Sequence, residues 1–167
     1  MSHLQLLLVV RHGKAERDSL TGRDEDRVLR PRGVRQAQFL GNKLIEMPPE
    51  IKPQVILASP VIRAADTARI IAQFAGVPLE FHPELSTSSD HHAVLELLHE
   101  RDRAGNHTRI MIVGHNPTLE ELVSTLCRGG SGLSGGMRTG MAAVLEVDKG
   151  LTRAKLHSVL REDWDDE

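Results

Sequence analysis

A run of five aliphatic residues near the start of the chain constrains its fold more than any other stretch. Residues 6–10 are all leucine or valine, and the run ends abruptly at Arg11, His12 and Gly13. A strand with one solvated face would alternate apolar and polar residues, so this unbroken run predicts a strand buried on both faces. Arg11 and His12 then lie at the carboxyl end of that strand, where open α/β sheets bind their ligands.

Two further aliphatic runs, at residues 55–58 and 110–113, are also followed by polar side chains. Between the runs, apolar residues at spacings of three and four predict helices. The expected helices are residues 33–47, 60–76, 94–101 and 118–126, with a short strand at 79–81 and a strand pair at 142–147 and 156–160. Strands that alternate with helices predict an α/β fold with three layers, α/β/α, and a mostly parallel central sheet.

Capping residues predict where two of these helices begin. Ser59 is expected to be an N-cap, with Pro60 at the first helical position. Thr118 is expected to cap a later helix, with Glu121 three residues on completing a capping box.

Length and composition limit the class of protein. The 167 residues are expected to form a single domain, 1–167, with an acidic and frayed tail at 162–167. Aromatic residues make up 2% and the net charge is −2, which argues against nucleic-acid binding. The single Cys excludes an internal disulfide, and no His or Cys spacing matches a zinc site.

The run at residues 6–10 is too short to span a membrane and lacks signal-peptide flanks, so we expect a cytoplasmic protein without membrane contact. Nothing in the sequence predicts an oligomeric state.

The polar residues at the three strand ends form one candidate site. If the three buried strands are parallel neighbours, Arg11, His12, Arg63 and His115 converge at one edge of the sheet. Two guanidinium groups and two imidazoles suit an anion, and arginine binds phosphate oxygens in a planar, bidentate manner. Each residue alone has an ordinary explanation as a turn or surface residue, but their repeated placement at strand ends favours a phosphate site.

Several motifs around these residues resemble those of the histidine phosphatase (phosphoglycerate mutase-like) superfamily. They are Arg11-His12-Gly13, residues 59–63 with Thr67-Ala68, and Gly114-His115. A finer resemblance, to the phosphohistidine phosphatase or SixA-like branch, is carried by residues 11–16, 29–37, 114–117 and 139–146. The resemblance implies a phosphoglycerate mutase-like fold and a phosphatase activity.

The same resemblance implies a mechanism and roles for individual residues. His12 would attack phosphorus and form a phosphohistidine that water hydrolyses, so it must be neutral, with its other ring nitrogen held by an acceptor such as a main-chain carbonyl. Arg11, Arg63 and His115 would hold the phosphoryl oxygens, with no metal or cofactor. Further candidates for phosphate binding are Gly13, Lys14, Ser59 and Asn116. An alternative interpretation of Asn116 is that it holds its own turn and His115 in place.

The general acid is the open element of this mechanism. Glu84 and Asp90 lie in the polar segment 82–92, but neither stands in a recognisable donor motif. An alkoxide leaving group needs a proton from such an acid, whereas phosphohistidine releases imidazole, a better leaving group. We therefore expect a phosphatase that acts on a phosphohistidine-bearing protein, for example a histidine phosphotransfer domain in a signalling relay. Two alternatives stay open: a phosphomonoesterase that uses Glu84 or Asp90 as acid, and a catalytically silent phosphoprotein-binding module.

Overall fold

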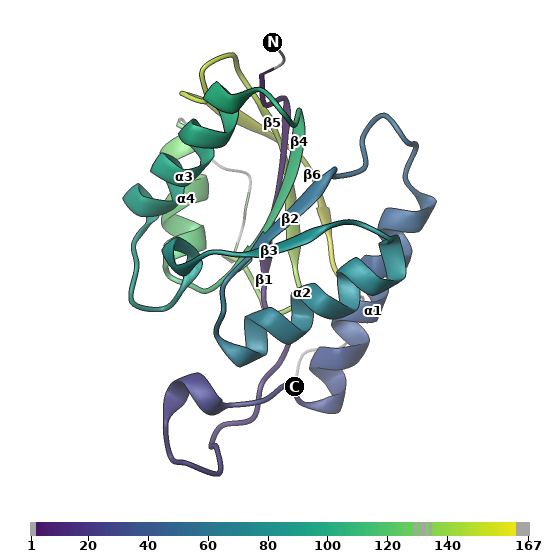
Figure 1. Ribbon diagram of the computed structural model, residues 1–167, viewed down its shortest axis with the longest axis vertical. Coiled ribbons are helices and arrows are strands. Elements are labelled where there is room, and N and C mark those ends of the chain that lie inside the picture. Colours follow the sequence, from purple (N-terminus) through teal and green to yellow (C-terminus); the bar gives the residue numbers. More distant parts are fainter. Residues whose placement is uncertain (1–2, 129, 131–132, 134, 163–167) are drawn as a thin grey trace.

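A six-stranded sheet forms the centre of the protein (Figure 1). The computed structural model describes residues 3–162 apart from 129, 131, 132 and 134, so residues 163–167 of the predicted tail lie outside the described part. The strands are β1 (Leu6–Arg11), β2 (Val55–Ala58), β3 (Leu79–Phe81), β4 (Arg109–Gly114), β5 (Ala142–Val147) and β6 (Ala154–Leu160). The helices are α1 (Pro31–Glu46), α2 (Ile62–Ala75), α3 (His91–Ala104) and α4 (Thr118–Leu126), with short 3₁₀ turns η1 (Asp24–Asp26) and η2 (Pro83–Leu85).

The strand order is β3-β2-β4-β1-β5-β6, and the first four strands of this order are parallel. Arg11 at the end of β1 pairs with Gly114 at the end of β4, so the carboxyl ends of these two strands meet. β5 runs antiparallel to β1, and β6 runs antiparallel to β5. The carboxyl end of β6 therefore lies at the same edge of the sheet as the ends of β1 and β4. The predicted α/β fold with a mostly parallel sheet is confirmed.

Helices α3 and α4 cover one face of the sheet and helices α1 and α2 cover the other (Figure 1), with a cluster of buried apolar residues on each face. Leu7 and Val9 of β1 belong to the cluster that contains the apolar residues of α3 and α4. Leu8 and Val10, which point to the opposite face, pack with the apolar residues of α1 and α2. Each such side chain contributes roughly 1.5–3 kcal/mol when it is fully buried. Burial on both faces is the physical reason for the unbroken aliphatic run. Within the described residues, no helix is both long enough and apolar enough to cross a membrane.

Both predicted helix starts are wrong by one or more residues. α2 begins at Ile62, and Ser59 lies outside it, fully buried, with its hydroxyl accepting a hydrogen bond from the Val61 N–H at 3.1 Å. α4 begins at Thr118 itself, so Thr118 is a helical residue rather than the cap. Its hydroxyl donates to the Ser89 carbonyl at 3.3 Å, because the helix is packed against the segment that precedes α3. At Thr118 a tertiary hydrogen bond replaces the expected capping bond, whereas the Ser59 hydroxyl keeps a local bond at a position two residues before the N-cap, Val61.

The start of α1 is packed directly against the tip of β1. The Lys14 N–H donates to the Gln36 side chain at 2.9 Å, and the Lys14 carbonyl accepts from the Arg30 N–H at 2.9 Å. A Cβ atom on Gly13 would come within 2.6 Å of the Gly33 carbonyl oxygen, and a Cβ on Gly33 would overlap the carbonyl oxygen of Lys14. Glycine at both positions therefore allows the two backbones to approach.

We predict that Gly33→Ala destabilises the protein by about 1–3 kcal/mol, because the added methyl group meets rigid backbone rather than a movable side chain. The measurement is the free energy of unfolding in urea. Gly114→Ala is the matched control, since its Cβ would have ordinary contacts of 3.5 Å with Leu85 and Leu119. Equal stability of the two variants would contradict the proposed close contact.

Candidate active site

Three strand ends bring the predicted residues together. His12 follows β1, His115 follows β4, and Arg63 lies in the first turn of α2, after β2. All three are buried, with 6%, 4% and 4% of their surfaces exposed, respectively. The His12 and His115 ring centroids are 5.2 Å apart, and the Arg63 Nε lies 3.4 Å from the His12 Nε2. Residues separated by up to about a hundred positions in sequence thus share one small polar site at the edge of the sheet.

The hydrogen bonds of His12 define the roles of its two ring nitrogens. Nδ1 lies 2.7 Å from the Gly13 carbonyl oxygen, which can only accept a hydrogen bond. Nδ1 must therefore carry the proton, as expected for a ring held by a main-chain carbonyl. Nε2 then keeps its lone pair, and it accepts from the Arg63 Nε–H. Such an unprotonated nitrogen has the property that a nucleophile requires.

Burial keeps both imidazoles neutral. Removal from water lowers the pKa of His12 to about 4; the nearby Arg63 and Arg11 also lower it, whereas the bond to the Gly13 carbonyl opposes the change. The pKa of His115 is lowered to about 3, chiefly by burial and also by His12 and Arg63. At neutral pH the positive charge of the site therefore comes from its arginines, while the two imidazoles carry none.

Ser59 orients His115. Its hydroxyl accepts from the Val61 N–H and lies 2.8 Å from the His115 Nε2. Donation of the hydroxyl proton to Nε2 satisfies both buried groups, and it leaves the ring proton on Nδ1. The His115 Nδ1 is buried and has no hydrogen-bond partner within the described chain. Among the described residues, this N–H is therefore a buried donor with no acceptor.

Arg63 is held by a residue that the sequence did not indicate. Its Nη1 donates to the Asp24 carbonyl at 2.9 Å, and its Nη2 forms an ion pair with the Asp24 carboxylate at 3.0 Å. Asp24 belongs to η1, in the long polar segment between β1 and α1. Burial raises the pKa of Asp24, but its bonds to Arg63 and Arg27 prevail and the net shift is downward. Asp24 is therefore a carboxylate at neutral pH.

Arg11 is held from the other side of the site. Its Nη1 donates to the Met137 carbonyl at 3.0 Å, and this carbonyl also accepts from the Asn116 side chain at 2.9 Å. The Glu120 carboxylate joins the network by accepting from the Asn116 amide at 3.0 Å and from the Met137 N–H at 2.9 Å. These bonds agree with the interpretation that Asn116 stabilises its turn. Neither Glu120 nor Met137 had a signal in the sequence, because only the tertiary fold brings residue 137 to this turn.

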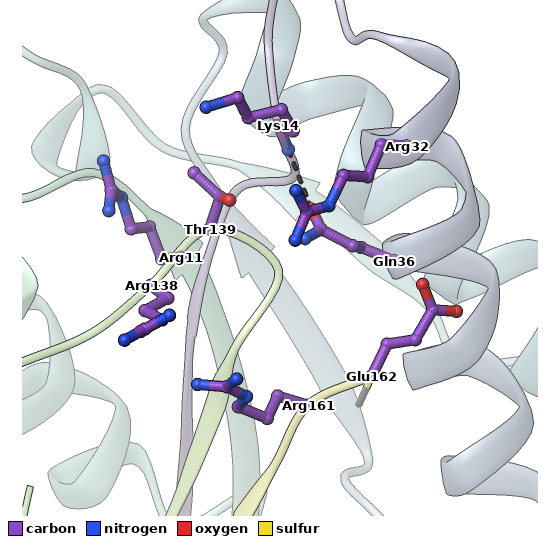
Figure 2. Close-up of a pocket in the computed structure, with 8 residues that line it drawn as sticks. All are labelled: Arg11, Lys14, Arg32, Gln36, Arg138, Thr139, Arg161 and Glu162. Carbon is purple, nitrogen blue, oxygen red and sulfur yellow. Dashed lines mark hydrogen bonds between the residues drawn. The ribbon is translucent and has the colours of Figure 1, made fainter. Parts of the chain in front are cut away.

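Two other candidates lie beside the site with their backbone groups already engaged. The Gly13 N–H donates to the Thr67 hydroxyl at 3.0 Å, and this hydroxyl donates to the Arg63 carbonyl at 2.7 Å. Thr67 therefore ties the tip of β1 to α2, which explains why it accompanies Arg63 in the motif. The Lys14 N–H donates to Gln36 (Figure 2), and the Lys14 side chain borders a neighbouring pocket rather than the His12 ring.

The two candidate acids, Glu84 and Asp90, lie outside the hydrogen-bond network described above. Asp90 is the N-cap of α3 and accepts from the Ala93 N–H at 3.1 Å. Glu84 is half-buried in η2, beside β4. In the described part of the chain, neither carboxylate forms a hydrogen bond or ion pair with Arg11, His12 or Arg63. Over the same residues, no group of three or more His, Cys, Asp or Glu side chains is arranged to hold a metal ion.

Comparison with known proteins gives this site a family context. Residues 7–88 match the model of the histidine phosphatase superfamily (branch 1). The structure of SixA from Agrobacterium tumefaciens has a TM-score of 0.81 and 24% identity, over 95% of this chain and 99% of that chain. A protein histidine phosphatase SixA solved with tungstate has a TM-score of 0.81 and 23% identity, over 93% and 96% of the two chains. An uncharacterized protein of a Picosynechococcus species is 28% identical over 156 residues, which are 91% of this chain and 90% of that protein. The fold is of the phosphoglycerate mutase-like type.

We predict that acidification destabilises the protein through its buried imidazoles. The unfolded chain binds a proton at His12 with a pKa near 6.5, whereas the folded protein does so only at about 4. The contribution of the neutral His12 imidazole to the free energy of unfolding is therefore complete above pH 6.5, and it is lost as the pH falls toward 4. Between pH 7 and 5, the free energy of unfolding of the wild type should fall by about 2 kcal/mol more than that of His12→Gln. Equal losses in urea titrations of the two proteins would refute the lowered pKa.

Proposed function

We propose that this chain, whose residues 7–88 match the histidine phosphatase superfamily, is a phosphatase of that superfamily and hydrolyses phosphohistidine on a protein partner. The observation that carries the proposal is the state of His12. It is a buried, neutral imidazole with its proton held by the Gly13 carbonyl, and its Nε2 lone pair faces the Arg63 guanidinium. This arrangement suits a nucleophile that attacks a phosphoryl group bound by arginine.

The reaction has two in-line displacements at phosphorus. First, the His12 Nε2 forms a bond to phosphorus while the bond from phosphorus to the substrate histidine breaks. The substrate imidazole keeps the electron pair and takes up a proton from solvent water. Next, water attacks the phosphorus, the bond to Nε2 breaks, and inorganic phosphate is released with the histidine neutral again. His12 starts each cycle ready to attack because burial keeps it unprotonated well below neutral pH.

Three donors would stabilise the charge on the phosphoryl oxygens. Arg11 and Arg63 supply permanent positive charge, and the His115 Nδ1–H supplies a neutral donor whose direction Ser59 maintains. The arginines are held in advance by the Met137 carbonyl and by Asp24. Preorganised donors of this kind are each worth about 10²–10³ in rate. These three donors support a reaction in which side chains of this chain stabilise the phosphoryl charge.

The carboxylates favour a phosphorus–nitrogen bond in the substrate. Asp24, the carboxylate bound to Arg63, has a lowered pKa and so is a poor proton donor at neutral pH. Asp90 is occupied at the start of α3. An alkyl phosphate needs a general acid for its alkoxide, but the imidazole of phosphohistidine leaves without one. The described residues thus support phosphohistidine rather than a phosphomonoester as the substrate. A phosphomonoesterase would need a carboxylic acid as the proton donor, and Glu84 is the remaining candidate for that role.

A protein substrate is supported by the name of one structural relative, a protein histidine phosphatase. A histidine phosphotransfer domain, which carries its phosphohistidine on an exposed helix, would fit a role in a signalling relay. The source of the phosphohistidine is then a kinase-type phosphotransfer reaction, and the enzyme would reverse the signal.

We predict that rapid quenching during turnover traps acid-labile, base-stable phosphate on the wild type. The label should be absent from His12→Ala, and kcat should fall by at least about 10⁴-fold because the nucleophile is lost. The measurement is mass spectrometry or radiolabel retention after quenching in base, with Arg103→Gln on the distant helix α3 as the control. Label that persists in His12→Ala would exclude His12 as the nucleophile. Binding of a phosphohistidine protein without any turnover by the wild type would favour the silent binding module.

We also predict that Glu84→Gln and Asp90→Asn leave the hydrolysis of phosphohistidine within about twofold of the wild type. Neither carboxylate is needed when imidazole is the leaving group. The test compares kcat/KM for phosphohistidine and for an alkyl phosphate in each variant. A wild type that prefers the alkyl phosphate, with activity lost in Glu84→Gln, would establish the phosphomonoesterase alternative.

A further inference from the structure

A second hollow lies beside the proposed active site, on the same edge of the sheet. Its volume is about 330 Å³, and it is bounded by the tip of β1, the start of α1, the turn before β5 and the residues after β6 (Figure 2). Five basic side chains line it: Arg11, Lys14, Arg32, Arg138 and Arg161. Among the described lining residues, Glu162 is the single acid, so the formal charge of this lining is +4 (five minus one). We call this hollow the basic pocket.

The basic pocket is distinct from the proposed reaction centre but adjoins it. His12, Arg63 and His115 are not among the described residues that line it. Arg11 belongs to both, because it stands at the end of β1 next to His12 and also forms part of the pocket wall. A group bound in the basic pocket would therefore sit beside a phosphoryl group bound at His12.

The charge of the basic pocket is opposite to that of the whole molecule. The chain has a net charge of −2, so this concentration of cations is a local feature and not the consequence of a basic surface. Gln36 and Thr139 add neutral polar groups to the same lining. The lining thus has the chemistry of an anion-binding site.

We propose that the basic pocket binds Asp or Glu side chains of the protein substrate, next to the phosphohistidine. This inference rests on the proposed function. Guanidinium groups pair with carboxylates in a bidentate manner, and a cluster of them also accelerates the encounter with an acidic surface. Nucleic acid is a poorer match, because the described lining contains no aromatic side chain on which a base could stack.

The test uses two phosphohistidine peptides that differ only near the modified residue. One has Asp and Glu within three positions of the phosphohistidine, and the other has Asn and Gln in their place. For the wild type, kcat/KM should be about tenfold or more higher for the acidic peptide, since a hydrogen-bonded charge pair is worth about one order of magnitude. Added salt should reduce this ratio, because exposed charges are screened.

Arg32→Gln and Arg161→Gln should bring the ratio close to one. The ratio is independent of how much active enzyme each preparation contains, so partial misfolding does not affect it. The matched control is Arg103→Gln, which should keep the wild-type ratio. Arg103 is an exposed residue of α3, and α3 covers the face of the sheet opposite to α1. Equal kcat/KM for the two peptides in the wild type, or an unchanged ratio in both pocket variants, would overturn the inference while the proposed function stands.

A binding measurement separates this inference from the proposed function. If neither peptide is hydrolysed, the proposed function fails, and the unphosphorylated acidic and amide peptides are compared by fluorescence anisotropy with the full chain. Tighter binding of the acidic peptide, lost in Arg161→Gln, would support the basic pocket as a carboxylate site. Equal binding of the two peptides would overturn it.

Discussion

The parallel pairing of β1 with β4 determines where every group of the candidate site lies. Arg11 pairs with Gly114, and the residues that follow each of them are the two histidines, so the register places His12 beside His115. A slip of one residue would turn the apolar side chains of β1 from one core to the other and would separate the imidazoles. The register is secured because β1 is buried on both faces and between two strands. The precision of the site therefore derives from the packing of the sheet.

The electrostatics of the site follow from the same burial. Two arginines lie close to two imidazoles, and the low pKa values of His12 and His115 keep these rings from adding charge. Asp24 and Glu120 balance the arginines from the periphery, one by an ion pair with Arg63 and the other through the turn that binds Arg11. The charged groups of Arg11 and Arg63 are thus held in place without a carboxylate of the described residues in contact with the His12 ring. On the far side of Arg11 the basic pocket extends the positive charge along the sheet edge.

Patterns that depend on neighbours in sequence were predicted well. The aliphatic runs identified β1, β2 and β4, the helical spacing identified α1 to α4, and the strand pair expected at 142–147 and 156–160 corresponds to β5 and β6. Local capping rules were less successful: Ser59 and Thr118 have the right side chains for caps, but the fold uses their hydroxyls for His115 and for the Ser89 carbonyl. A capping rule considers only neighbours in sequence, so it does not include these partners from other parts of the fold. The motif residue Thr67 was recognised, but its bond between Gly13 and Arg63 was not.

The sequence by itself determined the α/β class, the strands whose ends carry polar chemistry, and the identity of Arg11, His12, Arg63 and His115 as a group. Hydrophobic periodicity and short motifs contain this information because both are local along the chain. Only the tertiary structure decided which nitrogen of His12 is free, what holds Arg63 and Arg11, and that residues from four separate segments enclose the basic pocket. These features depend on residues that are far apart in sequence, such as Asp24 and Arg63, which form an ion pair, or Arg11 and Arg161, which line the same pocket. No local pattern records such contacts, because they exist only after the sheet and its two helical layers have packed.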